Sequence, residues 1–142
     1  MVVQSFKNHG RFVFMFHFVT YSAIVAVIIG SIVNLVNSSK ENLYSASLLV
    51  VVSLILASLA WFGRRFALKA QDRAIRAEEN FRHFILTGRP LDHRLRMGQI
   101  IALRFASDEE FVGLCQQAAD KNLKGVDIKK AIQNWRADHH RA

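Results

Sequence analysis

Six histidines are the residues of this chain best able to bind a metal-centred cofactor, because a neutral imidazole nitrogen is a common axial ligand of haem iron. They are His9, His17, His83, His93, His139 and His140. Only His17 lies within a long apolar stretch, where an ionisable side chain is a functional hypothesis by default. His17 is therefore a candidate ligand of a haem or a chlorophyll-type pigment. Alternatively, its ring only forms a hydrogen bond with a neighbouring Ser, Asn or backbone group.

The pigment hypothesis carries a geometric requirement. The second apolar stretch, residues 43–62, contains no His and no Met, so the apolar stretches of one chain do not supply two axial ligands. A pigment would be five-coordinate or would lie between two chains. The leading prediction is a chain without a cofactor, and pigment binding at His17 at an oligomer or subunit interface is the alternative.

The other reactive side chains do not form a catalytic pattern. Cys115 is the single cysteine, which rules out an internal disulfide and favours a small buried thiol on a helix. Adjacent carboxylates occur at Glu78-Glu79 and at residues 108–110, where a helix surface and a helix N-terminus account for them. The sequence contains no glycine-rich phosphate loop, zinc-binding His-Glu-x-x-His helix, nucleophile elbow or Cys-x-x-Cys pair. We therefore expect a non-enzyme.

Two apolar stretches dominate the first half of the chain. Residues 12–63 carry only two formal charges, Lys40 and Glu41, and a helix needs about 20 apolar residues to cross a bilayer. We predict spans over about residues 12–36 and 43–63, joined by a polar turn at residues 37–42. The first stretch is too long for the apolar region of a signal peptide, so we expect it to be retained.

Basic residues near the span ends predict the orientation of the hairpin. Lys7 and Arg11 precede the first span, and only Lys40 lies in the turn. The residues that follow the second span form a basic cluster, Arg64, Arg65, Lys69, Arg73 and Arg76. Because cytoplasmic flanks carry the excess of Lys and Arg, both termini are expected in the cytoplasm. The cluster also predicts attraction to anionic lipids, whereas the acids interleaved after residue 76 argue against nucleic-acid binding.

Small residues in both spans predict how the hairpin packs, since close approach of membrane helices requires small side chains. The first span offers Ser22, Ala26, Gly30 and Asn34, and the second offers Ala46, Ser53, Ala57 and Ala60. We expect the two stripes to face each other, with the alternative that one of them faces another protein. The many Phe residues near residues 6–18 and 61–66 indicate either a partner surface or simple contact with lipid.

The region 64–142 is polar and helical in pattern, and it forms the predicted second domain, after the hairpin of residues 1–63. Apolar residues spaced by three and four extend the second span to about Leu86, where Gly88 and Pro90 end the helix. About three short helices follow: residues 91–105, a helix to about Asn122 opened by a capping box of Ser107 and Glu110, and a last helix capped by Asp127. The fold class is an all-α membrane protein.

Four stretches of the sequence resemble a known family. They are QSFKNH at residues 4–9 with FHF at 16–18, QDRAIRAEE at 71–79, QIIALRFASDEE at 99–110 and IKKAIQNW at 128–135. The chain resembles an uncharacterised bacterial membrane family, filed as a domain of unknown function. The resemblance implies a two-span protein of the bacterial inner membrane and assigns no activity to any residue.

These observations favour an accessory or scaffold subunit that docks on a larger membrane complex, or on copies of itself, by helix packing. Self-assembly into a channel is a further alternative. The residues whose substitution would be most informative are Asn8, His9, His17, Asp72, Arg73, Arg104 and Trp135. We also expect Asp72 to pair with Lys7 or Arg11 near the membrane surface.

Overall fold

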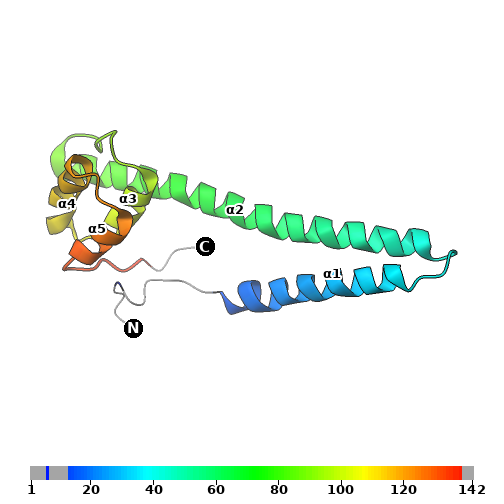
Figure 1. The fold of residues 1–142 in the computed structure, drawn as a ribbon. Coiled ribbons are helices and arrows are strands. Elements are labelled where there is room, and N and C mark those ends of the chain that lie inside the picture. Colours follow the sequence, from blue (N-terminus) through cyan, green and yellow to red (C-terminus); the bar gives the residue numbers. More distant parts are fainter. Residues whose placement is uncertain (1–5, 7–12, 139–142) are drawn as a thin grey trace. The chain divides into compact units, whose positions relative to one another are not determined.

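The computed structural model describes residue 6 and residues 13–138. Within these residues the chain is helical and contains no strand, only an isolated bridge between Ala106 and Trp135. The described residues divide into two compact units, residues 13–66 and residues 67–138, and residue 6 is grouped with the second. Figure 1 draws the helices α1 to α5 of the two units. The predicted all-α class is confirmed, and each unit is described by itself below.

The first unit is a pair of apolar helices. A π-helical turn η1 (Met15–Thr20) leads into α1 (Tyr21–Val36), and α2 (Leu43–Thr87) begins after the turn. The side chains of Asn37 and Ser38 donate to the carbonyls of Val33 and Asn34, at 2.7 and 2.6 Å, and so satisfy acceptors at the end of α1. Met15–Val36 and α2 are both long and apolar enough to cross a membrane.

Side chains buried or half-buried on facing sides of α1 and α2 follow a regular pattern. On α1 they are Tyr21, Ile24, Ile28, Ser31 and Leu35, and on α2 they are Ala46, Val50, Ser53, Ala57 and Ala60. Steps that alternate between three and four residues keep one face of a helix toward its neighbour, as in a coiled coil. The Oγ atoms of Ser31 and Ser53 lie 3.3 Å apart across this seam. The seam is thus closed by a polar contact as well as by apolar packing.

The α1 side of the seam differs from the predicted stripe. Ser22, Ala26, Gly30 and Asn34 are all exposed, and a Cβ added at Gly30 would meet no atom within 4 Å. Each step of four residues advances about 40° beyond a full turn, so a row of such steps drifts off one face. The predicted α2 residues do lie on the seam, because their spacing of seven, four and three follows the coiled-coil repeat.

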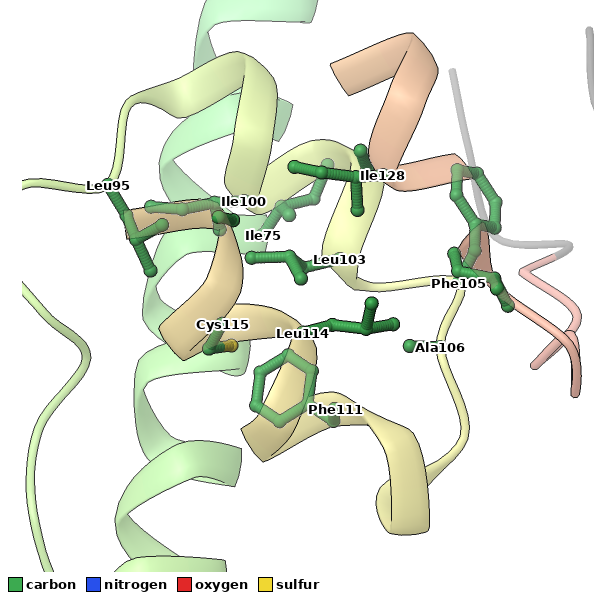
Figure 2. Close-up of a cluster of buried hydrophobic side chains, with 13 residues drawn as sticks. Ile75, Leu95, Ile100, Leu103, Phe105, Ala106, Phe111, Leu114, Cys115 and Ile128 are labelled. Atoms are coloured by element: carbon green, nitrogen blue, oxygen red, sulfur yellow. The ribbon is translucent and has the colours of Figure 1, made fainter. Parts of the chain in front are cut away.

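The second unit, which we call the C-terminal module (residues 67–138), contains the rest of α2 and three short helices. These are α3 (Met97–Leu103), α4 (Asp108–Asp120) and α5 (Gly125–Ala131). Its core gathers residues from α3, α4 and α5 and from the segment between α3 and α4, whereas α2 contributes Ile75 (Figure 2). The long helix ends as predicted, since Gly88 adopts a left-handed φ of 71° that suits glycine.

Two predicted features on either side of α3 are wrong. Residues 91–96 are not helical, because Asp92 accepts hydrogen bonds from Arg94 and Asn80 accepts from the Leu91 N–H, so side chains hold this segment as a turn. Helix α4 does begin after Ser107, but the Glu110 carboxylate does not complete a capping box. It accepts instead from the backbone N–H groups of Gln133 and Asn134, at 3.0 and 2.9 Å.

The last helix also differs from its prediction. It begins at Gly125, so Asp127 lies within its first turn, and it ends at Ala131. Trp135 lies beyond the helix, where its backbone bridges to Ala106. Gly125 is required by contact with α3, because a Cβ there would lie 2.8 Å from the Gly98 carbonyl oxygen.

We expect Gly125→Ala to destabilise the C-terminal module by about 1–3 kcal/mol, since backbone at the α3–α5 contact must shift to admit a methyl group. Gly113→Ala is the matched control, because a Cβ there meets nothing within 4 Å and Ala favours a helix by about 0.5–1 kcal/mol over Gly. Hydrogen exchange of the α3 and α5 amides in the full chain measures the change in module stability for each of the two variants. Equal protection in the two variants would refute the close contact.

Candidate functional site

Arg82 on α2 contacts several groups of the C-terminal module at once. Its guanidinium contacts the Glu79 carboxylate at 3.0 Å, the Asp108 carboxylate at 2.6 Å and the Ala106 carbonyl at 2.8 Å. The same group lies 4.2 Å from the centre of the Phe111 ring, within cation–π range. Arg82 therefore fastens α2 to the start of α4. We call Glu79, Arg82, Asp108 and Phe111 the Arg82 cluster.

Ionisation in the Arg82 cluster is controlled by burial. Burial raises the pKa of the Glu79 carboxyl, and the hydrogen bond and charge of Arg82 only partly oppose this. Burial also raises the pKa of the nearby Cys115 thiol to about 12, and the Glu79 charge acts in the same direction. Cys115 therefore remains a neutral thiol near pH 7, which is the form that packs and not the form that attacks an electrophile.

The Glu79 carboxyl should make module stability depend on pH. Its pKa is raised in the folded chain, so its contribution is fully present below the unfolded pKa and is lost as pH rises through the folded pKa. Gln at this position keeps the volume and does not ionise. We therefore expect the melting temperature of the native chain to fall relative to that of Glu79→Gln as the pH rises from about 4 to about 7, because only the native chain must ionise a buried carboxyl. The melting temperatures are measured by Trp135 fluorescence in a Trp61→Phe background. A difference in melting temperature that does not change with pH would contradict the raised pKa of Glu79.

A second ion pair holds the C-terminal end of the described chain. Arg104 contacts the Asp138 carboxylate at 3.1 Å and lies over the Phe105 ring at 4.7 Å. Phe105 in turn packs against Trp135, with ring centres 5.1 Å apart. Two residues singled out from the sequence, Arg104 and Trp135, are thus brought together around Phe105. Their contacts are structural, and they anchor the segment after α5.

The outer side of α2 in the module presents large apolar side chains to solvent. Phe81, Phe84 and Ile85 are 64%, 53% and 66% exposed, and Leu86 is 41% exposed. We call these four residues the Phe81 face. Three of them, Phe81, Ile85 and Leu86, line a cavity of about 390 Å³. The rest of its lining is charged and consists of Glu78, Arg136 and three residues of the Arg82 cluster, Glu79, Arg82 and Asp108. The sequence predicts that either the apolar stripe of α2 or a partner completes the small module core. Phe81 and Phe84 lie outside that core, so the alternative of a partner stays a prediction for these two rings.

His17 lies in the π-helical turn at the start of the first apolar helix. Its Nδ1 atom donates to the Val13 carbonyl at 2.9 Å, and its ring meets the Phe16 ring edge-on with centres 5.4 Å apart. This backbone contact is the one expected under the hydrogen-bonding interpretation, whereas pigment binding stays a prediction. Among the described residues, no group of three or more His, Cys, Asp or Glu side chains is placed to hold a metal ion.

The predicted basic cluster divides between the two units. Arg64 is half-buried with its guanidinium 5.6 Å from the Phe16 ring, while Arg65, Lys69, Arg73 and Arg76 are exposed. Other residues of interest, Lys7, Asn8, His9, Arg11, His139 and His140, lie outside the described part of the chain. The expected pairing of Asp72 with Lys7 or Arg11 lies outside it as well.

The fold and these contacts define an all-helical chain with two helices suited to a membrane and a small module built on an internal salt-bridge cluster. A family model described as "Family of unknown function (DUF6526)" matches residues 1–142. The chain belongs to this family, as the resemblance implied. Neither the curated proteins nor the solved structures contain a match to the chain.

Proposed function

We propose that this protein is a non-catalytic accessory or scaffold subunit of the bacterial inner membrane. It crosses the bilayer twice, and both termini lie in the cytoplasm. Two helices that each contain a long charge-free apolar stretch support the spans, and the excess of Lys and Arg outside the turn supports the orientation. The exposed apolar surface of both helices suits contact with acyl chains or with neighbouring membrane helices.

The Phe81 face carries the docking part of the proposal. It belongs to the polar half of the chain, beyond a stretch that includes Arg64, Arg73 and Arg76. Exposed Phe, Ile and Leu side chains that lie together on a small water-facing module indicate a protein contact, since aromatic residues dominate the energetics of interfaces. The partner is a further membrane-protein subunit or another copy of this chain.

In this mechanism α2 links the spans to the module, and the basic residues Arg64, Arg65, Lys69, Arg73 and Arg76 attract anionic lipids. The Arg82 cluster holds the start of α4 against α2 beside the Phe81 face, since residues of both line one cavity. The cluster thereby fixes the surroundings of the Phe81 face. The exposed stripe of Ser22, Ala26, Gly30 and Asn34 offers a second packing surface within the membrane. No step of this mechanism requires catalysis or nucleic acid.

The proposal is tested by purifying the full chain from its native membrane in mild detergent and identifying subunits that co-migrate. Phe81→Ser/Phe84→Ser should release the partner while leaving hydrogen exchange of the module core unchanged, because both rings are exposed. Val126→Ser is the matched control, since Val126 is 54% exposed and lies on α5. Retention of the partner by the double variant would refute docking through this face.

The same preparation separates docking from pigment binding at His17. A docking subunit is colourless in the visible range. An absorbance band that disappears in His17→Ala would favour the pigment hypothesis and count against the proposal.

A further inference from the structure

We propose that the C-terminal module binds a phosphate ester in a cavity between α2 and the segment that leads into α3. The cavity has a volume of about 510 Å³, which is within the range of small-molecule sites. Arg73 and Arg76 line it from α2, and Leu91, Met97 and Ile100 line it from the opposite side. The site does not depend on docking through the Phe81 face. It deepens the role that the proposed function gives to Arg73 and Arg76 at anionic lipids, because it adds a defined cavity for one ligand per chain.

The two arginines give the cavity its charge. Arg73 and Arg76 are three residues apart, so both lie on one face of α2. Neither forms an ion pair with any described residue, whereas Arg82, Arg94 and Arg104 are each paired with a carboxylate. A planar guanidinium matches the oxygens of a phosphate group with two parallel hydrogen bonds. Two such groups at one cavity suit a phosphate carrying one or two negative charges.

The acidic side chain in the cavity wall does not cancel this charge. Asp92 is held by Arg94, whose Nε and Nη2 atoms lie 3.0 and 2.7 Å from its Oδ2 atom. The backbone N–H of Arg94 also donates to Asp92, at 2.8 Å. Arg94 also contacts the Asp120 carboxylate at 2.9 Å, so its single charge is shared between Asp92 and Asp120. Arg73 and Arg76 nevertheless carry two positive charges at a cavity whose lining includes one carboxylate, that of Asp92.

The rest of the lining indicates that the ligand has an apolar portion. Ala77 on α2 faces the same cavity as Leu91, Met97 and the buried Ile100. A bare inorganic anion gains nothing from such a wall, whereas the carbon part of an ester is removed from water there. The wall is also held in place, because the Asn80 Oδ1 atom accepts the Leu91 N–H at 2.9 Å. The cavity therefore suits a phosphate ester from a membrane glycerophospholipid or from a soluble metabolite.

Native mass spectrometry of the delipidated full chain in detergent tests the site. The probes are phosphatidylglycerol, glycerol 3-phosphate and the zwitterionic phosphatidylcholine. We expect saturable binding of one anionic phosphate ester per chain and at least tenfold weaker binding in Arg73→Gln/Arg76→Gln, from the loss of about two charge-assisted hydrogen bonds. Binding of phosphatidylglycerol alone assigns a lipid ligand, and binding of glycerol 3-phosphate assigns a soluble one.

Two further variants distinguish the cavity from general charge attraction. Ala77→Trp keeps the charge and fills the cavity from an exposed position on α2, so it should also abolish saturable binding. Arg89→Gln/Lys121→Gln removes two exposed positive charges that do not line the cavity and should bind within about twofold of the native chain. Equal loss in both charge variants, undiminished binding in Ala77→Trp, or absence of saturable binding to either anionic probe would overturn the proposal. Unchanged hydrogen exchange of α3 and α4 confirms that each variant is folded.

Discussion

Arg82→Met is expected to destabilise the C-terminal module by about 3–5 kcal/mol, because removing one partner of a buried ion pair leaves the other charge without compensation. The Arg82 side chain is 10% exposed and the Glu79 side chain 9% exposed, so Glu79 would have to ionise without its partner or take up a proton. The Ala106 carbonyl would lose its donor as well. Amide hydrogen exchange in α3 and α4 of the full chain should accelerate more than about a hundredfold.

A double variant separates loss of the ion pair from loss of packing. Glu79→Leu/Arg82→Met replaces the pair by apolar side chains and should recover most of the lost stability, since a buried pair is often replaced by apolar residues without cost. Failure of the double variant to recover protection would mean that Arg82 acts mainly through Asp108 and Phe111. Protection equal to the native chain in Arg82→Met alone would contradict the role assigned to the cluster.

Phe111→Ala is the second substitution expected to have a large effect, at about 3–5 kcal/mol. The Phe111 side chain is fully buried among the core residues of α3 and α4, and its ring also lies beneath Arg82 and beside His83, with a ring-centre distance of 6.1 Å to the latter. The substitution leaves a cavity and removes the cation–π contact. A small helical module has about 5 kcal/mol or less in reserve, so a large fraction should be unfolded.

Phe81→Ala is the matched control for Phe111→Ala, because the same ring is removed from an exposed position on the outer side of α2. It should change module stability by less than about 0.5 kcal/mol. Thermal melting followed by Trp135 fluorescence, in a Trp61→Phe background, compares the two. Similar melting temperatures for Phe111→Ala and Phe81→Ala would show that the core is not organised around Phe111.

The sequence predicts those features that local signals specify. Charge-free stretches of sufficient length define the two apolar helices, and Gly88 followed by Pro90 ends α2 where predicted. These signals depend on the composition and order of neighbouring residues alone. The family assignment also follows from contiguous stretches of sequence, and the family model extends over residues 1–142.

The face of α2 that meets the module was not predictable in this way. Apolar spacing places Phe81 and Phe84 on a stripe that suits either the core or a partner. The residues of α2 whose side chains are largely buried in the module are instead Ile75, Glu79 and Arg82. Glu79 and Arg82, three residues apart, give a local hint of an ion pair. The other partners of Arg82, Ala106 and Asp108, lie 24 and 26 residues away in the sequence, and no periodicity reveals such contacts.

The short helices were misplaced for a related reason. Glu110 has the sequence position of a capping-box residue, but it accepts from Gln133 and Asn134, which follow α5. The Glu110 carboxylate thus accepts hydrogen bonds from residues distant in the sequence instead of from the N-terminus of its own helix. The α1 seam was misassigned because small residues four apart were taken as one face, whereas Ser31 meets Ser53 on a face defined by alternating steps of three and four.

Accessibility of single cysteines to a membrane-impermeant maleimide tests the central claim, that the chain crosses the inner membrane twice with its module in the cytoplasm. In a Cys115→Ala background, the account predicts that Lys40→Cys is labelled in intact spheroplasts and that Lys121→Cys is labelled only after lysis. Labelling of both positions from outside, or of Lys121→Cys alone, would contradict it.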